Sequence, residues 1–412
     1  MALSCFCTRR ISICIWLLLE CVQQRSVAIE GSVFYAADSQ YLQYTGRVEK
    51  NGSQTFFEWS GVKVGILLRC PLDATSFQVH LDEPQWKWKG WLPEEEKTKY
   101  AVQVNGRRIS SFSTNAKTKA YSVSLPVADD ATRFVEVVKI TERVSIPVLW
   151  SLSEGQPATT FHGISIPEIC SVLPPPKRPS RRLEFIGDSI TCGFGNLAKN
   201  VGDRAKCTFP PAGWRDYEDF GKTTASLVAT TFGAELHSQC ISQLGIMRNG
   251  DTLNSTTIYN ASHYIHRTLP TLPHPMWDYS TWAPGVAVVN LGTNDYDLSQ
   301  YFHKQPSFDD FERNYAAFLS DYVSRYAGHL SALVIACGPM TKVQCPSVEK
   351  VAARLGQEFS ELTVKYVELS LNQQGGCMLH PDEAGHRSLQ QALVPVISEL
   401  VGWSDSVRDI IV

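Results

Sequence analysis

Three short clusters of polar residues could carry out chemistry, although they lie far apart in the chain. They are Gly187-Asp188-Ser189, Gly292-Thr293-Asn294-Asp295 and His380-Pro381. The first two follow short apolar runs that are typical of buried strands, and the third precedes a C-terminal helical pattern. Sites in open parallel sheets form at the carboxyl ends of the strands. The pattern therefore predicts one site built from these clusters.

Ser189 is the candidate nucleophile of this site. A serine hydroxyl is a weak nucleophile until a neighbouring base removes its proton, and His380 could be that base. A serine directly after a buried strand can point upward from the sheet edge, with its own N–H facing the substrate oxygen. The alternative is that Ser189 only caps the next helix. The sequence Ile190–Gly195 that follows favours the catalytic interpretation.

Composition describes an ordinary globular protein. Hydrophobic residues make up 43% of the 412-residue chain and charged residues 19%, which argues against disorder. The formal net charge of −3 gives no reason to expect nucleic acid or an anionic membrane as a partner. No cluster of side chains demands a metal, and no cofactor is expected. The length predicts two domains.

The N-terminus has the pattern of a secretory signal peptide over residues 1–28. Arg9 and Arg10 precede the apolar run Ile11–Leu19, and small residues end at Ala28. This run is shorter than the about 20 residues that span a bilayer, and no other stretch is long and apolar enough. We therefore predict cleavage near Ala28 and a secreted protein without a stable membrane span. An uncleaved signal anchor is the alternative.

Residues 31–172 favour an all-β domain. Short alternating runs such as Ser76–Leu81 and Phe134–Ile140 recur between turn signals such as Asn105-Gly106, which predicts a sandwich or jelly roll. The proline-rich segment 173–180 is extended and marks the domain boundary.

After this linker, short apolar runs alternate with helical patterns, which predicts a parallel sheet covered by helices on both faces. The predicted strands are Leu183–Ile186, Gly285–Leu291, Leu333–Ala336 and Thr363–Leu369. The predicted helices are Thr223–Phe232, Phe308–Tyr326, Val348–Phe359 and Pro381–Val401. The fold class is therefore α/β, a three-layer α/β/α domain over residues 181–405 after an all-β sandwich domain.

The segment Phe185–Asn196 reads Phe-Ile-Gly-Asp-Ser-Ile-Thr-Cys-Gly-Phe-Gly-Asn and resembles the first block of the SGNH, or GDSL-type, hydrolase superfamily. Gly292–Asp295 resembles the third block, and His380 resembles the histidine of the fifth. The glycine of the second block is assigned to Gly245, within Ser242–Asn249. The order and spacing of the blocks make this resemblance far more specific than any one motif.

The N-terminal region extends the resemblance to carbohydrate esterase family 2. It carries, in order, Thr45-Gly46-Arg47, Trp59-Ser60-Gly61, Val104-Asn105-Gly106, Lys139-Ile140-Thr141-Glu142 and Phe161-His162-Gly163. Members of that family pair a jelly-roll domain with an SGNH domain and deacetylate plant polysaccharides. The resemblance implies a secreted serine esterase that acts on an acetylated polysaccharide or oligosaccharide.

The resemblance also implies the roles of individual residues. Ser189 attacks the ester carbonyl, and His380 takes its proton and returns it to the leaving sugar hydroxyl. The oxyanion hole consists of the Ser189 and Gly245 backbone N–H groups and the Asn294 side-chain amide. Asp188 is expected to bond loop backbone and has no assigned chemistry.

One position departs from the superfamily pattern. Most SGNH enzymes have an aspartate three residues before the histidine, where this chain has Cys377. Some members of the esterase family use a Ser-His dyad oriented by a backbone carbonyl, and we predict the same here. Asp382 is expected to complement the N-terminus of the last helix, and His386 is expected to be structural.

Cysteines and tryptophans allow looser predictions. Eight of the twelve cysteines lie beyond the predicted signal, so disulfides are possible. Cys377–Cys345 and Cys192–Cys207 are candidate pairs, and free buried thiols are the alternative. Asn51, Asn254 and Asn260 begin glycosylation sequons. Trp277 or Trp282 could stack on a sugar ring. The run Trp86–Trp91 is interpreted as a wall of the domain interface, with glycan binding as the alternative.

Two other functions remain open from the sequence. The same serine hydrolase mechanism could act on a lipid or a thioester, although no apolar lid is evident. The missing carboxylate at Cys377 could instead indicate a glycan-binding protein without catalysis.

Overall fold

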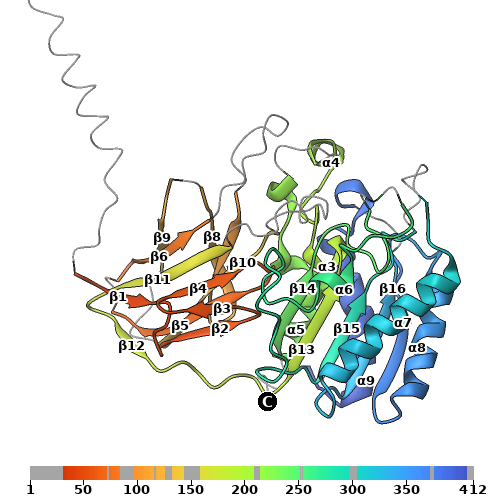
Figure 1. The fold of residues 1–412 in the computed structure, drawn as a ribbon. Coiled ribbons are helices and arrows are strands. Elements are labelled where there is room, and N and C mark those ends of the chain that lie inside the picture. Colours follow the sequence, from red (N-terminus) through yellow and green to blue (C-terminus); the bar gives the residue numbers. More distant parts are fainter. Residues whose placement is uncertain are drawn as a thin grey trace, which may run out of the picture.

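A computed structural model shows two antiparallel sheets packed against each other, followed by a parallel sheet between helices (Figure 1). It describes residues 31–71, 74–83, 97–115, 117–125, 132–142, 158–207, 214–250, 252, 254–296, 304–371 and 375–405. The predicted signal peptide and the run Trp86–Trp91 lie outside the described residues. Within the described residues, no helix combines the length and the apolarity needed to cross a membrane.

The N-terminal region is a sandwich of two sheets, as the alternating pattern predicts. One sheet has the order β3-β4-β11-β6-β9 with β1 beside β11, and the other has the order β12-β5-β10-β7-β8 with β2 beside β5. The strands are β1 (Ser32–Ala36), β2 (Leu42–Thr45), β3 (Glu49–Asn51), β4 (Gln54–Phe57), β5 (Lys63–Arg69), β6 (Ser76–Asp82), β7 (Lys99–Val104), β8 (Arg107–Ser113), β9 (Ala120–Ser124), β10 (Thr132–Lys139), β11 (Thr159–Pro167) and β12 (Ser171–Leu173).

Alternation of side chains builds the core between these two sheets. In β6, Phe77, Val79 and Leu81 are buried while the residues between them are half-buried. The turn between β7 and β8 is Asn105-Gly106, and both residues have positive φ (49° and 77°). Two positive φ angles suit the two-residue hairpin turn that this dipeptide favours.

The C-terminal region confirms the predicted α/β class. Its sheet has the order β14-β13-β15-β16-β17, and every neighbouring pair is parallel. The strands are β13 (Arg182–Gly187), β14 (Glu235–Cys240), β15 (Val286–Asn290), β16 (Ala332–Cys337) and β17 (Thr363–Glu368). The helices are α3 (Ser189–Cys192), α4 (Val201–Lys206), α5 (Thr224–Phe232), α6 (Ala261–Tyr264), α7 (Phe308–Arg325), α8 (Cys345–Glu358) and α9 (Glu383–Val401), with 3-10 turns η1 (Trp214–Tyr217), η2 (Phe220–Lys222) and η3 (Cys377–Leu379).

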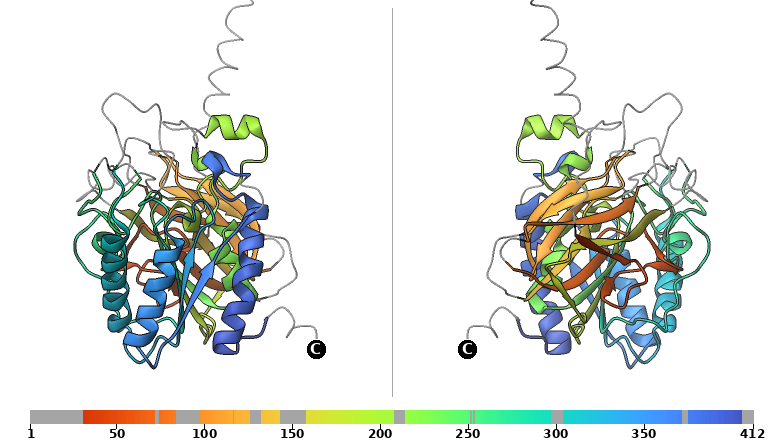
Figure 2. Two further views of the ribbon diagram at one scale, coloured as in Figure 1. Left: turned by 90° about the vertical axis from the view of Figure 1, so that its right-hand side faces the viewer. Right: turned by 90° about the vertical axis from the view of Figure 1, so that its left-hand side faces the viewer.

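Both faces of the parallel sheet are covered, which explains why its central strands are apolar throughout (Figure 2). Val286 and Val288 of β15 pack with the buried residues of α5 and α9. Ala287 and Val289 of the same strand pack with those of α7 and α8.

Strand β14 is not predicted from the sequence because its residues are largely polar. Glu235–Cys240 forms an edge of the parallel sheet, yet all six residues are buried. The first domain and the linker cover this edge: β2 contacts β14, and Arg178 forms an ion pair with Glu235 at 2.8 Å. Burial of this strand therefore comes from contacts that local sequence cannot show.

Arg47 anchors the β-sandwich to the second domain. Its side chain is fully buried, pairs with Glu184 of β13 at 3.1 Å, and donates to the carbonyl oxygens of Ile265 and Arg267. The guanidinium also lies over the rings of Trp277 and Tyr279, 5.1 and 5.7 Å from their centroids. A buried charge is tolerated only when it is paired and hydrogen-bonded, and this one is.

The eight cysteines among the described residues form four disulfides, in a pattern that differs from the predicted one. The pairs are Cys70–Cys170, Cys192–Cys240, Cys207–Cys377 and Cys337–Cys345. Both predicted pairings, Cys192–Cys207 and Cys377–Cys345, are therefore wrong. Cys192 follows β13 and Cys240 ends the neighbouring β14, so the error follows from missing that strand.

Candidate active site

Ser189 lies at the first turn after β13, at the carboxyl edge of the parallel sheet. The cap of α3 is Asp188, whose carboxylate accepts the Ile190 N–H at 3.0 Å, so Ser189 is not needed as a cap. Gly187 permits the tight turn, because a Cβ there would lie 2.0 Å from the Thr191 hydroxyl oxygen. The Ser189 hydroxyl is thereby left for another partner.

That partner is His380, which arrives from the loop before α9. Its Nε2 lies 2.7 Å from Ser189 Oγ, and its Nδ1 lies 2.9 Å from the carbonyl oxygen of Cys377. A carbonyl can only accept, so Nδ1 carries the proton and Nε2 is free to accept the serine O–H. The arrangement is a Ser-His pair in which a backbone carbonyl takes the place of the usual carboxylate.

The carboxylate and the second histidine near this loop have other partners. Asp382 caps α9 by accepting the Gly385 N–H at 2.8 Å. His386 is fully buried and accepts the Thr224 N–H at Nδ1, at 3.2 Å. Burial, with a smaller contribution from His380, lowers the pKa of His386 to about 3, so this imidazole is neutral in the folded protein at neutral pH.

Gly245 lies in the loop after β14, which Asp295 holds in place. The buried Asp295 carboxylate accepts the N–H groups of Ile246, Met247 and Arg248 at 2.8 to 3.1 Å. A Cβ at Gly245 would lie 1.8 Å from the Arg248 carbonyl oxygen, so only glycine fits this turn. Desolvation raises the pKa of Asp295 to about 6, and the three backbone donors oppose that shift.

Asn294 joins the serine turn to the Gly245 loop. Its Nδ2 donates to the Leu244 carbonyl oxygen at 2.9 Å and to the Asp188 carboxylate at 3.2 Å. The Gly245 N–H donates to Asn249 Oδ1 at 3.1 Å. The structure therefore places the predicted oxyanion donors around the serine turn, with Asn294 and Gly245 bonded to protein oxygens.

The two tryptophans predicted as sugar platforms do not lie at this site. Trp282 is buried, stacks on His237 with ring centroids 3.6 Å apart, and donates to Glu235 at 3.1 Å. Trp277 lies beside His237 and under Arg47. Glu235 begins β14, so both rings are at the amino end of the sheet, opposite Ser189. This prediction is wrong because the segment that carries them leads into β15, and residues before a parallel strand lie at its amino end.

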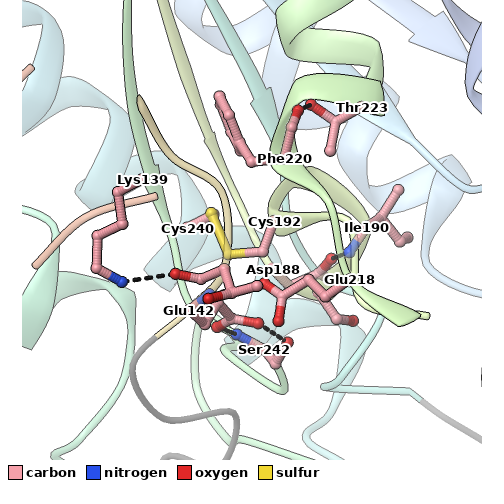
Figure 3. Close-up of a disulfide and its surroundings, with 12 residues drawn as sticks. Lys139, Glu142, Asp188, Ile190, Cys192, Glu218, Phe220, Thr223, Cys240 and Ser242 are labelled. Atoms are coloured by element: carbon pink, nitrogen blue, oxygen red, sulfur yellow. Dashed lines mark hydrogen bonds between the residues drawn. A yellow bond between two sulfur atoms is a disulfide. The ribbon is translucent and has the colours of Figure 1, made fainter. Parts of the chain in front are cut away.

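Several residues of the site were not found from the sequence. The carboxylate of Glu142, from the β-sandwich, bonds Ser242 in the Gly245 loop. The Cys207–Cys377 disulfide fixes the carbonyl that orients His380. The Cys192–Cys240 disulfide, shown in Figure 3, joins the serine turn to β14. Only the motif Lys139–Glu142 gives a signal in the sequence, and that signal indicates family resemblance alone. Among the described residues, no group of three or more histidine, cysteine or acidic side chains could hold a metal.

A Ser-His pair at the carboxyl edge of a parallel sheet, with the serine in a Gly-Asp-Ser turn, fits the arrangement expected of an SGNH-type hydrolase. The family model described as GDSL-like Lipase/Acylhydrolase matches residues 183–393, and the chain belongs to this family. This confirms the resemblance that the sequence blocks carry.

Relatives and solved structures fit the two-domain arrangement. The chain is 29% identical over 312 residues to the cellulase/esterase CelE of Acetivibrio thermocellus, covering 73% of this chain and 34% of that protein. It is 26% identical to an acetylxylan esterase/glucomannan deacetylase of Cellvibrio japonicus, covering 55% of this chain and 61% of that one. The chain thus spans between a third and three fifths of these relatives. A family two carbohydrate esterase from Clostridium thermocellum, solved with cellohexaose, has the same fold with TM-score 0.70 and 22% identity, covering 88% of this chain and 99% of that one.

Proposed function

We propose that the protein is a secreted esterase that removes acetyl or other short acyl groups from carbohydrate. The observation that carries the proposal is the chain of contacts from Ser189 Oγ through His380 to the Cys377 carbonyl oxygen. The names of the relatives, which include acetylxylan esterases, support the substrate class. Four disulfides support an oxidising compartment.

In the proposed mechanism, Ser189 Oγ attacks the ester carbonyl carbon while His380 Nε2 takes the hydroxyl proton. The Cys377 carbonyl accepts from Nδ1–H and stabilises the imidazolium that forms. The tetrahedral intermediate collapses as the bond to the sugar oxygen breaks and the His380 imidazolium protonates that oxygen, which releases the sugar hydroxyl and leaves an acyl group on Ser189. Water, activated by the same imidazole, then releases the acid and restores the serine.

The oxyanion donors in this proposal are the Ser189 and Gly245 N–H groups and Asn294 Nδ2. Each such donor typically lowers the barrier by about 3 kcal/mol. Asn294 already donates to Leu244 and Asp188, and the Gly245 N–H already donates to Asn249 Oδ1. We therefore expect one Asn294 bond and the Gly245 bond to exchange for the substrate oxygen as charge develops. The developing negative charge makes that exchange favourable.

The test is hydrolysis of p-nitrophenyl acetate and acetylated xylan by the full chain and by Ser189→Ala. Ser388→Ala, an exposed serine on α9, is the matched control. We expect the control to hydrolyse both substrates and Ser189→Ala to hydrolyse neither. Fluorophosphonate labelling of the wild type, absent in Ser189→Ala, would locate the nucleophile. No release and no labelling by a folded wild-type protein would contradict the proposal and favour a glycan-binding protein.

A longer-chain acyl hydrolase is the second candidate, and one observation favours it. Met378 and Leu379, directly before the histidine, are exposed to 50% and 64%. Apolar side chains at this position could contact an acyl chain or a lipid. A series of p-nitrophenyl esters from acetate to octanoate separates the two functions, because a carbohydrate deacetylase should lose kcat/KM as the chain lengthens.

A further inference from the structure

The end of strand β10 carries buried charged residues that the proposed mechanism does not use. Lys139 begins the motif Lys-Ile-Thr-Glu and Glu142 ends it, and these residues are 0% and 2% exposed. Arg215 and Glu218, from the second domain, meet them and are also buried. Buried charge is unfavourable unless it has specific partners, so the contacts of this cluster indicate what it does.

Glu142 crosses the domain boundary to hold Ser242. One carboxylate oxygen accepts the Ser242 N–H at 2.7 Å, and the other accepts the Ser242 hydroxyl (Figure 3). Ser242 follows β14 and lies three residues before Gly245. The carboxylate therefore fixes the point at which this loop leaves the sheet.

The backbone of Glu142 is itself held by the second domain. Its N–H donates to Glu218 at 2.8 Å, and its carbonyl oxygen accepts from Arg215 Nε at 3.1 Å. The Gly245 loop is thus fixed from two sides, by Glu142 at its start and by Asp295 at Ile246 to Arg248. Two carboxylates that bond opposite ends of one short loop leave little freedom for Gly245 between them.

We propose that Glu142 of the β-sandwich is a positioning residue for ester hydrolysis, acting through Ser242 on the oxyanion donor Gly245. The inference rests on the proposed function and gives the N-terminal domain a part in catalysis. A donor contributes fully only when it is held at the position of the developing charge, so a small displacement of the loop lowers kcat.

The ionisation of Glu142 matters because only a carboxylate accepts at both oxygens. Desolvation raises the pKa of Glu142 to about 7, while the Ser242 bonds, Lys139 and Arg215 favour the charged form. Glu218 faces the same cluster, and its pKa is raised well above the usual value by burial and by the Glu142 charge. Protonation of Glu142 below neutral pH replaces one acceptor with a donor, so the Ser242 N–H and hydroxyl can no longer both donate to the carboxyl group and the Ser242 hydroxyl must rotate.

The experiment compares Glu142→Ala, Glu142→Gln and Ser242→Ala in the full chain, with p-nitrophenyl acetate as substrate. Glu136→Gln is the matched control, because Glu136 lies on the same strand and pairs with Lys63 at 3.4 Å away from the site. Rates are divided by the concentration of sites that a fluorophosphonate labels. This correction removes any loss that comes only from unfolded protein.

We expect kcat per labelled site to fall about 10- to 100-fold in Glu142→Ala, with a KM change of less than about threefold. Glu142→Gln keeps one acceptor and should recover part of the rate. It cannot be protonated, so the decline of kcat between about pH 8 and pH 6 should become shallower than in the wild type. The control should match the wild type.

The inference is overturned if kcat per labelled site in Glu142→Ala and Glu142→Gln stays within twofold of wild type. A loss of labelled sites at unchanged kcat per site would also overturn it, since that marks a purely structural role. If Glu142→Ala does not fold, Glu142→Gln and Ser242→Ala decide by the same criterion. In all of these cases, wild-type hydrolysis that is lost in Ser189→Ala still supports the proposed function, so the two proposals are tested separately.

Discussion

The disulfide Cys207–Cys377 should be required for the rate because it holds the carbonyl that orients His380. Cys377 is fixed at three points: its N–H donates to the Gly195 carbonyl oxygen at 3.1 Å, its sulfur bonds Cys207, and its carbonyl oxygen meets His380 Nδ1 at 2.9 Å. The perturbation is the double variant Cys207→Ser/Cys377→Ser, which removes the tether without leaving a free thiol.

The magnitude follows from the hydrogen bond that would be loosened. A hydrogen bond to a group that becomes charged is worth about 1.5–3 kcal/mol, so its full loss lowers kcat by a factor of about 10 to 150. The tether also constrains the unfolded chain. Its sequence separation of 170 residues corresponds to at most about 5 kcal/mol of stability by loop-closure entropy.

The assay is kcat for p-nitrophenyl acetate per folded molecule, at a temperature where near-ultraviolet circular dichroism shows native packing. Cys337→Ser/Cys345→Ser is the control, because that disulfide spans only 8 residues and joins β16 to α8, whereas His380 lies in the loop before α9. It should lower stability by about 2.5 kcal/mol and leave kcat unchanged. Wild-type kcat in the folded Cys207→Ser/Cys377→Ser variant would refute the reasoning, as would an equal loss in the control.

Three further predictions test other contacts. Asn294→Ala should lower kcat about 100- to 1000-fold in steady-state hydrolysis, and a loss below tenfold would contradict its oxyanion role. Arg47→Met leaves the buried Glu184 unpaired and should reduce the unfolding free energy by about 3–5 kcal/mol in a urea titration, whereas no change would contradict the anchoring role. Because the pKa of His386 falls from 6.5 to about 3 on folding, its stability contribution is present above pH 6.5 and lost as pH falls towards 3. His386→Gln should flatten that decline by about 1.4 kcal/mol per pH unit between pH 6 and pH 4, and an unchanged slope would contradict the assignment.

The apolar central strands could be predicted from the sequence, and the polar edge strand could not. Strands β15 and β16 are buried by helices on both faces, so their composition alone identifies them. Strand β14 is buried by a different domain, and nothing in Glu235–Cys240 encodes that cover. Because the Cys240 partner depends on this strand, the disulfide pattern was beyond reach as well.

The order of the motifs predicts that Ser189 and His380 meet, and the structure places them in contact although 191 positions separate them in the sequence. The tryptophans failed because closeness to a motif in the sequence does not say which end of a strand a loop occupies. Trp282 precedes β15, whereas Asn294 follows it, and the length of that strand separates them. Strand direction was the available signal, since only loops that follow a parallel strand reach its carboxyl edge.

The partner of His380 shows why an orienting carbonyl leaves no trace in residue type. Every residue has a backbone carbonyl, so the acceptor for His380 Nδ1 is determined by the backbone conformation of the loop and not by the type of a side chain. Here Met378 and Leu379 have φ of 49° and 62°, a region that costs non-glycine residues about 1–3 kcal/mol each. Such a path persists only where the surroundings over-determine it, and the anchors are the Cys207 disulfide and the close fit of Gly195 against Cys377. Cys377, which stands where the aspartate is usual, therefore has two roles. Its carbonyl orients the His380 imidazole, and its disulfide holds that carbonyl in place.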